Sequence, residues 1–163
     1  MRRTTAIAVA SLTAALWSPT VATADPVAPQ PDTPCASNLS DVMTWPPGAN
    51  MALVCRAQQW QLVATPQPPN DQWLSYGPAM TLHGEGLRNP SIKSGDWTAT
   101  PQDSSSRCRA EQQAVVSPGV VGAPQVSEGK PGEPLSFQVV PRLFSIEMSG
   151  YCLWTRDGNQ TVH

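Results

Sequence analysis

Apolar and polar positions alternate along much of the chain, and this pattern predicts short strands with very little helix. The run at 51–64 alternates through Leu53, Cys55 and Ala57. We interpret it as one strand, although its lack of Gly and Pro is also compatible with a helix. A proline-rich loop at 65–70 predicts a hairpin leading into a second run at 72–82. Within that run, Gly77 and Pro78 predict a break into two shorter pieces.

The C-terminal half carries stronger strand signals. After turn signals at 84–90, a short strand is predicted at 96–100. At 106–117 small residues alternate with charged ones, which is typical of a half-buried antiparallel strand. Residues 118–134 are rich in Pro and Gly and predict a long connection, in which Val120, Val121 and Val126 would contact the core. Two last strands are predicted at 135–140 and 143–155, and Gly150 predicts a β-bulge that sets the register of Cys152.

Six or seven short strands together predict an all-β fold, a small disulfide-stapled antiparallel sandwich or open barrel with Pro/Gly-rich loops. One short helical turn is predicted at 37–45, ended by Pro46-Pro47-Gly48. The chain contains 18 prolines and only 13% charged residues, a composition that disfavours long helices. Because five tryptophans lie beyond residue 24, we expect a folded core despite the many loops.

The first 24 residues have the features of a secretory signal peptide. Arg2 and Arg3 precede an apolar run at 5–17, and small residues at 22–24 predict cleavage between Ala24 and Asp25. That run has 13 residues, whereas a spanning helix needs roughly 20. We therefore expect a secreted or extracytoplasmic protein of the cell envelope, with no transmembrane segment in the mature chain. A proline-rich spacer is predicted at 25–34, a single β domain at 35–156 and a flexible tail at 157–163.

Four cysteines follow the predicted cleavage site: Cys35, Cys55, Cys108 and Cys152. An even number in an exported chain predicts two disulfides, and sequence alone leaves three pairings open. We predict the nearest-neighbour pairing, which joins Cys35 to Cys55 and Cys108 to Cys152. A zinc site is disfavoured, because no two cysteines are close in sequence and the chain has only two histidines.

Charge and motifs exclude several function classes. Without Arg2 and Arg3, eight basic residues face twelve acidic ones, and no basic cluster suggests nucleic acid as a partner. The glycines lack phosphate-loop and dinucleotide spacing, so we expect no cofactor. His83 is the only histidine inside the predicted domain, since His163 is the last residue, and no G-x-S-x-G motif occurs. We predict no catalytic residue and no metal site.

A pair of carboxylates can suffice to hydrolyse a glycosidic bond, so the acidic residues are candidates as well. Those nominally available are Glu85, Asp96, Glu111 and Glu147. Nothing in their spacing marks a pair, and we interpret them as solvated surface charge.

The tryptophans are better candidates for function. Trp45, Trp73 and Trp97 lie beside Pro/Gly-rich breaks, where an exposed ring could bind a sugar or a partner protein. Burial in the core is the alternative for each of them. Trp154 follows Cys152 in an apolar alternation and is predicted to be in the core. Asn38 and Asn159 each begin a glycosylation sequon.

Three segments carry a resemblance to known proteins. The leader ending in ATADP, the strand CRAEQQAVV and the closing GYCLWTRDG resemble small exported proteins of actinobacteria, an uncharacterised family. The resemblance implies a bacterial setting in which the sequons are unused, and it implies no activity.

The leading hypothesis is a monomeric, non-catalytic exported domain that binds an unknown protein or glycan. A small secreted hydrolase and a carrier of an apolar small molecule are the alternatives. A deep pocket joining His83 to a carboxylate would favour the hydrolase, and an apolar cavity would favour the carrier. A flat, exposed aromatic patch would favour the binding domain.

Overall fold

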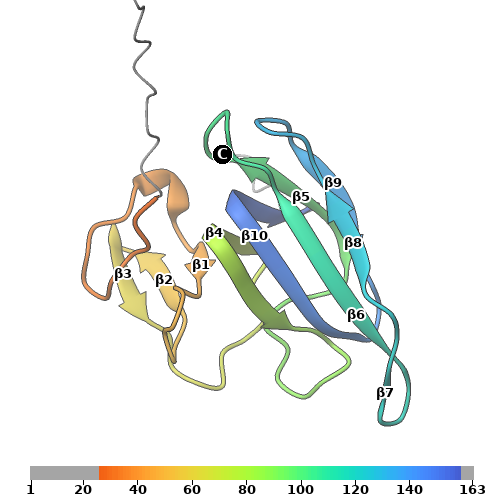
Figure 1. Cartoon of the computed structure of the whole chain (residues 1–163). Coiled ribbons are helices and arrows are strands. Elements are labelled where there is room, and N and C mark those ends of the chain that lie inside the picture. The colour runs from red at the N-terminus through yellow and green to blue at the C-terminus, as the bar shows by residue number, and fades with distance from the viewer. Residues whose placement is uncertain (1–25, 159–163) are drawn as a thin grey trace, which may run out of the picture.

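A computed structural model describes residues 26–158 and shows strands throughout, with a single short 3-10 turn in that range (Figure 1). The predicted signal peptide and its cleavage site, together with Asn159 and His163, lie outside the described residues. The elements in chain order are η1 (Ser37–Leu39), β1 (Met43–Thr44), β2 (Leu53–Arg56), β3 (Gln59–Leu62), β4 (Gln72–His83), β5 (Gly95–Pro101), β6 (Arg109–Ser117), β7 (Val120–Val121), β8 (Gln125–Glu128), β9 (Leu135–Val139) and β10 (Leu143–Arg156).

The two longest strands, β4 and β10, pair antiparallel at the centre of the sheet. Neighbouring strands follow the order β3-β2-β1-β4-β10-β5-β9, and β6 also pairs with β10 and carries β7 and β8. On the side away from β4, the first half of β10 pairs with β6 and the second half with β5. β1 runs parallel to β4, so the sheet is mixed, and it does not close into a barrel. The predicted all-β, disulfide-stapled fold is confirmed.

A β-bulge bends the central pair of strands. Between the aligned pairs Gly77–Gly150 and Met80–Met148, β4 has one residue more than β10. A bulge is thus present beside Gly150 as predicted, but the extra residue lies on β4 and not on the last strand. Gly150 itself has a φ of +93°, and a Cβ there would collide with the Arg107 carbonyl. The predicted break at Gly77 and Pro78 is wrong, because β4 continues through it. A proline is tolerated there because a bulge releases one residue from the hydrogen-bond ladder.

The segment at 51–64 is a hairpin of β2 and β3, not the single strand predicted. Ala57 and Gln58 form its two-residue turn with φ of 48° and 59°. Such turns normally carry Asn-Gly or a similar pair, and an Ala-Gln pair gives no such signal. The loop at 65–70 is likewise no hairpin loop, because β4 pairs with β1 and β10 instead of β3.

The sheet has a hydrophobic cluster on each face. The larger cluster packs Trp73, Trp97 and Trp154 with the Cys108–Cys152 disulfide, and all five side chains are fully buried. The smaller one gathers Val42, Leu53, Cys55, Trp60 and Leu74 beneath the N-terminal segment. Trp154 is in the core as predicted.

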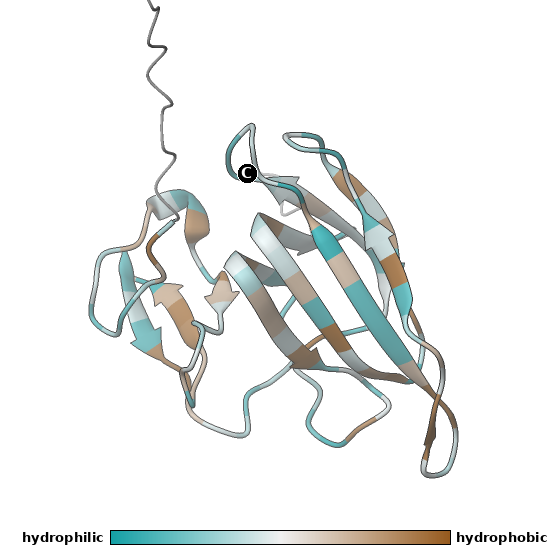
Figure 2. Cartoon of the chain, in the orientation of Figure 1, coloured by the Kyte–Doolittle hydropathy of each residue, from teal (hydrophilic) through white to brown (hydrophobic). Residues whose placement is uncertain are grey.

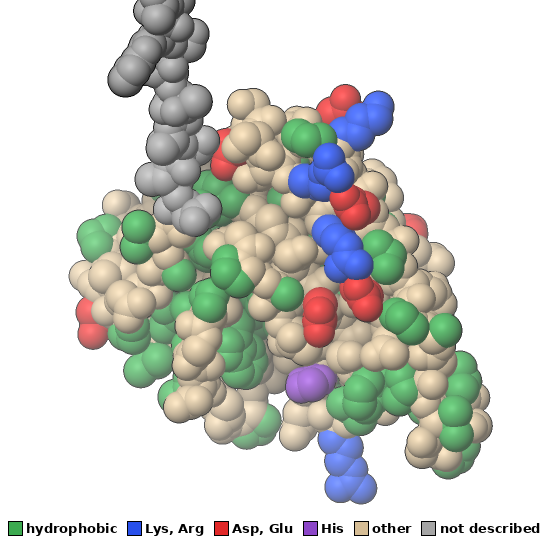
Figure 3. Space-filling model, viewed as in Figure 1, with side chains coloured by type: hydrophobic (Ala, Val, Ile, Leu, Met, Phe, Trp, Pro, Cys, Tyr) green, Lys and Arg blue, Asp and Glu red, His purple; other side chains and the backbone are tan. Residues whose placement is uncertain are grey.

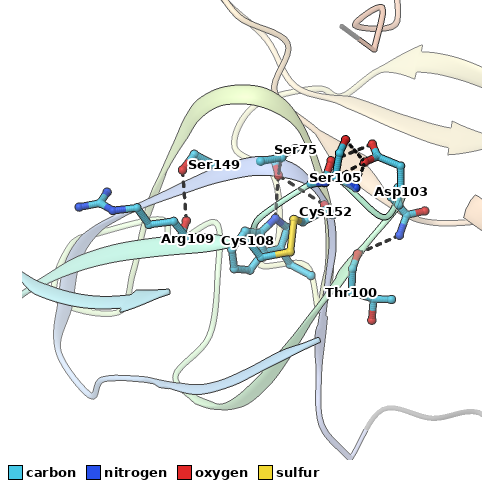
Figure 4. Close-up of a disulfide and its surroundings, with 12 residues drawn as sticks. Ser75, Thr100, Asp103, Ser105, Cys108, Arg109, Ser149 and Cys152 are labelled. Carbon is cyan, nitrogen blue, oxygen red and sulfur yellow. Dashed lines mark hydrogen bonds between the residues drawn. A yellow bond between two sulfur atoms is a disulfide. The ribbon is translucent and has the colours of Figure 1, made fainter. Parts of the chain in front are cut away.

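Both predicted disulfides are present, Cys35–Cys55 and Cys108–Cys152. The second lies where the neighbour of β10 changes from β6 to β5, and Figure 4 shows it beside Ser75. The buried Ser75 hydroxyl donates to the Gly150 carbonyl oxygen at 2.6 Å and accepts the Trp154 indole N–H at 2.9 Å. A buried polar side chain is stable here because both of its hydrogen-bonding roles are filled.

A second buried polar residue, Gln112, links β6 to β9. Its amide nitrogen donates to the Gln138 carbonyl oxygen at 2.8 Å, and its amide oxygen accepts the Val140 N–H at 3.0 Å. These strands are not paired with each other, so this side chain replaces ladder hydrogen bonds at the open seam of the sheet. Gln112 is buried, with 4% of its surface exposed.

Three boundaries differ from the sequence predictions. Residues 118–134 contain β7 and β8, and Val120, Val121 and Val126 are exposed instead of contacting the core. Part of the predicted spacer is bound to β3. The Asp32 backbone N–H donates to the Trp60 carbonyl oxygen, and Pro34 forms an isolated antiparallel β-bridge with Gln59. The predicted helical turn at 37–45 shrinks to η1 followed by β1.

At the other end, Asp157 of the predicted tail is tied to β5. Its backbone N–H donates to the Asp96 carbonyl oxygen, and its carboxylate accepts the Thr98 hydroxyl at 3.0 Å. Among the described residues there is no helix with the length and apolar character needed to cross a membrane.

Candidate functional site

Trp45 follows β1 and is held in place by the turn after it. Its indole N–H donates to the Ala49 carbonyl oxygen at 2.8 Å, and its backbone N–H donates to the Met80 sulfur at 3.3 Å. The ring is half-buried and packs against the larger hydrophobic cluster. A ring fixed in this way can contact a ligand without first losing conformational freedom.

The ring borders a surface hollow of about 390 Å³. Three segments distant in sequence build it: the turn after β1, the loop before β4, and the end of β4 with the loop that follows. Its lining residues are Trp45, Thr65, Pro66, Gln67, His83, Asn89 and Ser91. The structure thus brings together two residues that the sequence singled out, Trp45 and His83.

Gln67 is the feature of this hollow that its own fold does not explain. Both polar atoms of its side-chain amide are shielded from solvent, and neither has a hydrogen-bond partner among the described residues. A buried amide without partners costs about 1–3 kcal/mol. Folded proteins rarely leave such a group unpaired, and either an ordered water or a ligand that reaches the amide can supply its partner.

The polar character of the hollow is almost wholly neutral. Its lining combines two amides and two hydroxyl groups with the imidazole of His83. Each amide offers both donors and acceptors, and each hydroxyl can do either. None of the lining residues is acidic, so His83 has no carboxylate beside it there to act as the orienting group of a catalytic dyad.

The nearest acidic residue in sequence, Glu85, is occupied elsewhere. Its carboxylate accepts the Ser94 hydroxyl at 2.5 Å and the Ser94 N–H at 3.1 Å. These hydrogen bonds, the side-chain one first, lower the pKa of Glu85. Across residues 26–158 there is also no cluster of three or more His, Cys, Asp or Glu that could hold a metal ion.

The rings of the other two tryptophan candidates are not available to a ligand. Trp73 and Trp97 are fully buried, so an exposed binding role for either ring is wrong and the burial alternative holds. Their indole N–H groups donate to backbone carbonyls, of Asn70 at 3.2 Å and of Lys93 at 3.1 Å. Tryptophans beside Pro/Gly breaks are buried here because the loops fold back and accept their N–H groups.

Two of the four candidate acidic residues are cross-strand neighbours. Glu111 of β6 lies directly opposite Glu147 of β10, and Glu111 accepts a hydrogen bond from Arg109 at 2.6 Å. Figure 3 shows acidic and basic side chains alternating over this side of the molecule, where Arg107 and Arg109 also pair with Glu128. This arrangement matches the solvated charge that we expected.

Two further hollows flank the N-terminal strands. One, of about 440 Å³, borders β2 and β3 and includes the ion pair of Arg56 and Asp41 at 3.5 Å. The other, of about 350 Å³, is lined mainly by prolines and small residues at 29–31 and 46–51. Neither contains a shielded polar side chain without a partner, so the hollow beside Trp45 is the stronger candidate.

Sequence reasoning missed most of the lining. Thr65, Pro66 and Gln67 lie in a proline-rich loop, and Asn89 and Ser91 flank a turn, so each was interpreted only as a connection. Only the fold shows that these two loops meet at Trp45.

No family model, curated protein or solved structure matches this chain. Its function is therefore inferred from its own residues.

Proposed function

We propose that this chain is an exported, non-catalytic domain that binds a neutral glycan in the hollow beside Trp45. The observation that carries the proposal is the half-buried Trp45 ring, held by its hydrogen bond to Ala49 and bordered by neutral amide and hydroxyl side chains. The volume of about 390 Å³ falls within the roughly 300–1,000 Å³ of small-ligand sites.

Sugar chemistry fits this lining better than other ligand classes. An aromatic ring can cover the apolar face of a pyranose, while amides and hydroxyls exchange hydrogen bonds with its hydroxyl groups. The absence of acidic, Lys or Arg side chains from the lining favours an uncharged sugar over a uronic or sialic acid. An apolar cargo would cover the polar side chains of Thr65, Asn89 and Ser91 without pairing them.

Export is supported by the leader and by the two disulfides. The disulfides persist in oxidising compartments outside the cytoplasm. We accordingly infer that the ligand is met in the cell envelope or the medium.

Calorimetric titration of the mature protein tests the proposal. The probes are neutral tetrasaccharides of glucose, mannose and N-acetylglucosamine, with an oligogalacturonate as the acidic comparison. We expect at least one neutral probe to bind, and Trp45→Ala and Gln67→Ala each to weaken it by about tenfold. Trp45→Phe should retain most of the affinity, because it keeps a ring in place.

The matched control is Gln61→Ala, an exposed glutamine of β3 outside the hollow. Its affinity should equal that of the wild type. Absence of binding to every neutral probe would refute the proposal, as would binding that Trp45→Ala leaves intact.

A further inference from the structure

The β6–β7 hairpin and the start of β8 consist of uncharged residues. From Gln113 to Val126 the chain contains no Asp, Glu, Lys or Arg. Four of its valines are exposed, Val116 by 56%, Val120 by 49%, Val121 by 37% and Val126 by 53%, and Val126 lies opposite Glu111 of β6. We call residues 113–126 the valine hairpin. Figure 2 colours much of it as hydrophobic.

The valine hairpin extends beyond the body of the sheet (Figure 1). Its turn contains Pro118 and Gly119, with φ of +74° at the glycine, as a type II turn requires. Val115 pairs with Val121 and Ser117 with Val120, so the tip is an ordered protrusion. Exposed apolar side chains on an ordered, protruding tip are typical of an interaction site.

Two arginines lie at the base of the hairpin without an ion pair. Eight Lys and Arg residues fall within 26–158, and six of them pair with a carboxylate. Arg88 and Arg142 are the two described exceptions, and both are exposed.

Backbone contacts place both arginines beside the valines. The Arg142 carbonyl oxygen accepts the Val115 N–H of β6 at 2.9 Å, and the neighbouring Leu143 carbonyl oxygen accepts the Gly86 N–H at 2.8 Å. Arg88 follows two residues after Gly86. Glu85 is the acidic residue of that loop, and its carboxylate accepts a hydrogen bond from the Ser94 hydroxyl. One end of the molecule therefore combines an apolar tip with two uncompensated positive charges.

We propose that this end docks on an anionic lipid bilayer. The valines enter the headgroup region, and Arg88 and Arg142 contact lipid phosphates around them. A protruding tip with charges at its base suits a flat, negative surface, whereas a protein partner would have to supply a matching pit. Arg88 precedes Asn89 of the hollow beside Trp45 in the same loop, but no docking residue is a lining residue, so the two proposals are tested by different variants and different probes.

The docking is weak and depends on salt. The mature chain has twelve acidic residues against eight basic ones, so only the local placement of Arg88 and Arg142 favours an anionic surface. Each basic residue near such a surface changes the partition coefficient by about fivefold. The attraction falls off within a Debye length, about 10 Å at 0.1 M salt.

Cosedimentation of the mature protein with vesicles tests this inference. The vesicles contain equal parts of phosphatidylglycerol and phosphatidylcholine, and pure phosphatidylcholine vesicles provide the neutral comparison. We expect binding to the anionic vesicles at low ionic strength and little binding to the neutral ones. Arg88→Gln and Arg142→Asn should each lower the partition coefficient about fivefold. The double variant Val120→Ser, Val121→Ser should lower it about tenfold.

Two matched controls lie on other parts of the surface. Leu62→Ser removes an exposed apolar side chain of β3, and Lys130→Gln removes an exposed basic one. Both should bind as the wild type does. The inference is overturned if the wild type stays in the supernatant with anionic vesicles, or if the valine and arginine variants sediment unchanged. A protein with a complementary pit would then be the remaining kind of partner.

Discussion

Ala57 and Gln58 show how a single pair of residues can hide an element from sequence reasoning. Both adopt left-handed backbone conformations in the turn between β2 and β3. The left-handed region is sparsely populated by residues other than Gly, Asn and Asp. An alternating run with Ala-Gln at its centre therefore predicts an uninterrupted strand, and nothing local reveals the turn.

Relieving this turn should stabilise the protein. The double variant Ala57→Asn, Gln58→Gly matches the preference of a two-residue turn with both φ values positive. We expect the free energy of unfolding to rise by about 1 kcal/mol, measured by urea denaturation, because both side chains are exposed and lose no packing. Gln61→Gly in β3 is the control, which should lower stability. A double variant no more stable than the wild type would show that the turn carries no strain.

The three candidate tryptophans, Trp45, Trp73 and Trp97, have the same local sequence signal but different environments. All three stand beside breaks in the pattern, yet two are fully buried and only Trp45 borders a hollow. Their environments depend on loops that return from distant parts of the chain. The local sequence therefore identifies three candidate rings but does not show which of them is exposed.

At the scale of elements, long alternating runs were predicted best. β6, β9 and β10 were predicted within a few residues of their observed bounds, because each alternates over a core face. After Gln112 the alternation of β6 no longer marks buried positions. The strand extends past the core there, and Val116 is exposed. β7 and β8 were missed since exposed valines among Pro and Gly resemble a connection.

The two disulfides should differ in accessibility. Cys35 is half-buried, whereas Cys108 and Cys152 are fully buried in the core. Under native conditions we expect dithiothreitol to open Cys35–Cys55 first, as shown by alkylation and peptide mapping. Loss of the inner bond should also destabilise more, by about 4 kcal/mol against about 3, because it closes a loop of 44 residues instead of 20.

Urea denaturation of two paired variants provides the stability comparison. Cys35→Ala, Cys55→Ala removes the outer bond and Cys108→Ala, Cys152→Ala the inner one, so neither leaves an unpaired thiol. Equal rates of reduction, or greater destabilisation by loss of the outer bond, would contradict the expected order.

For the whole molecule, the sequence was sufficient for the fold class and for the presence of two disulfides, because alternation and an even number of cysteines are simple signals. The nearest-neighbour pairing is confirmed, although the sequence left three pairings open. The sequence did not reveal the order of the strands, because β10 changes its neighbour from β6 to β5 midway along its length. The candidate site depends on that topology, since its loops meet only after the sheet has formed.

A proton–nitrogen NMR titration with a neutral tetrasaccharide that binds in calorimetry tests whether the sugar occupies the hollow beside Trp45. We predict that the indole N–H signal of Trp45 and the side-chain amide signals of Gln67 shift together as the sugar is added. The indole signals of the fully buried Trp73 and Trp97 should move little. A bound sugar that leaves the Trp45 and Gln67 signals unmoved would contradict the assignment of this hollow as the glycan site.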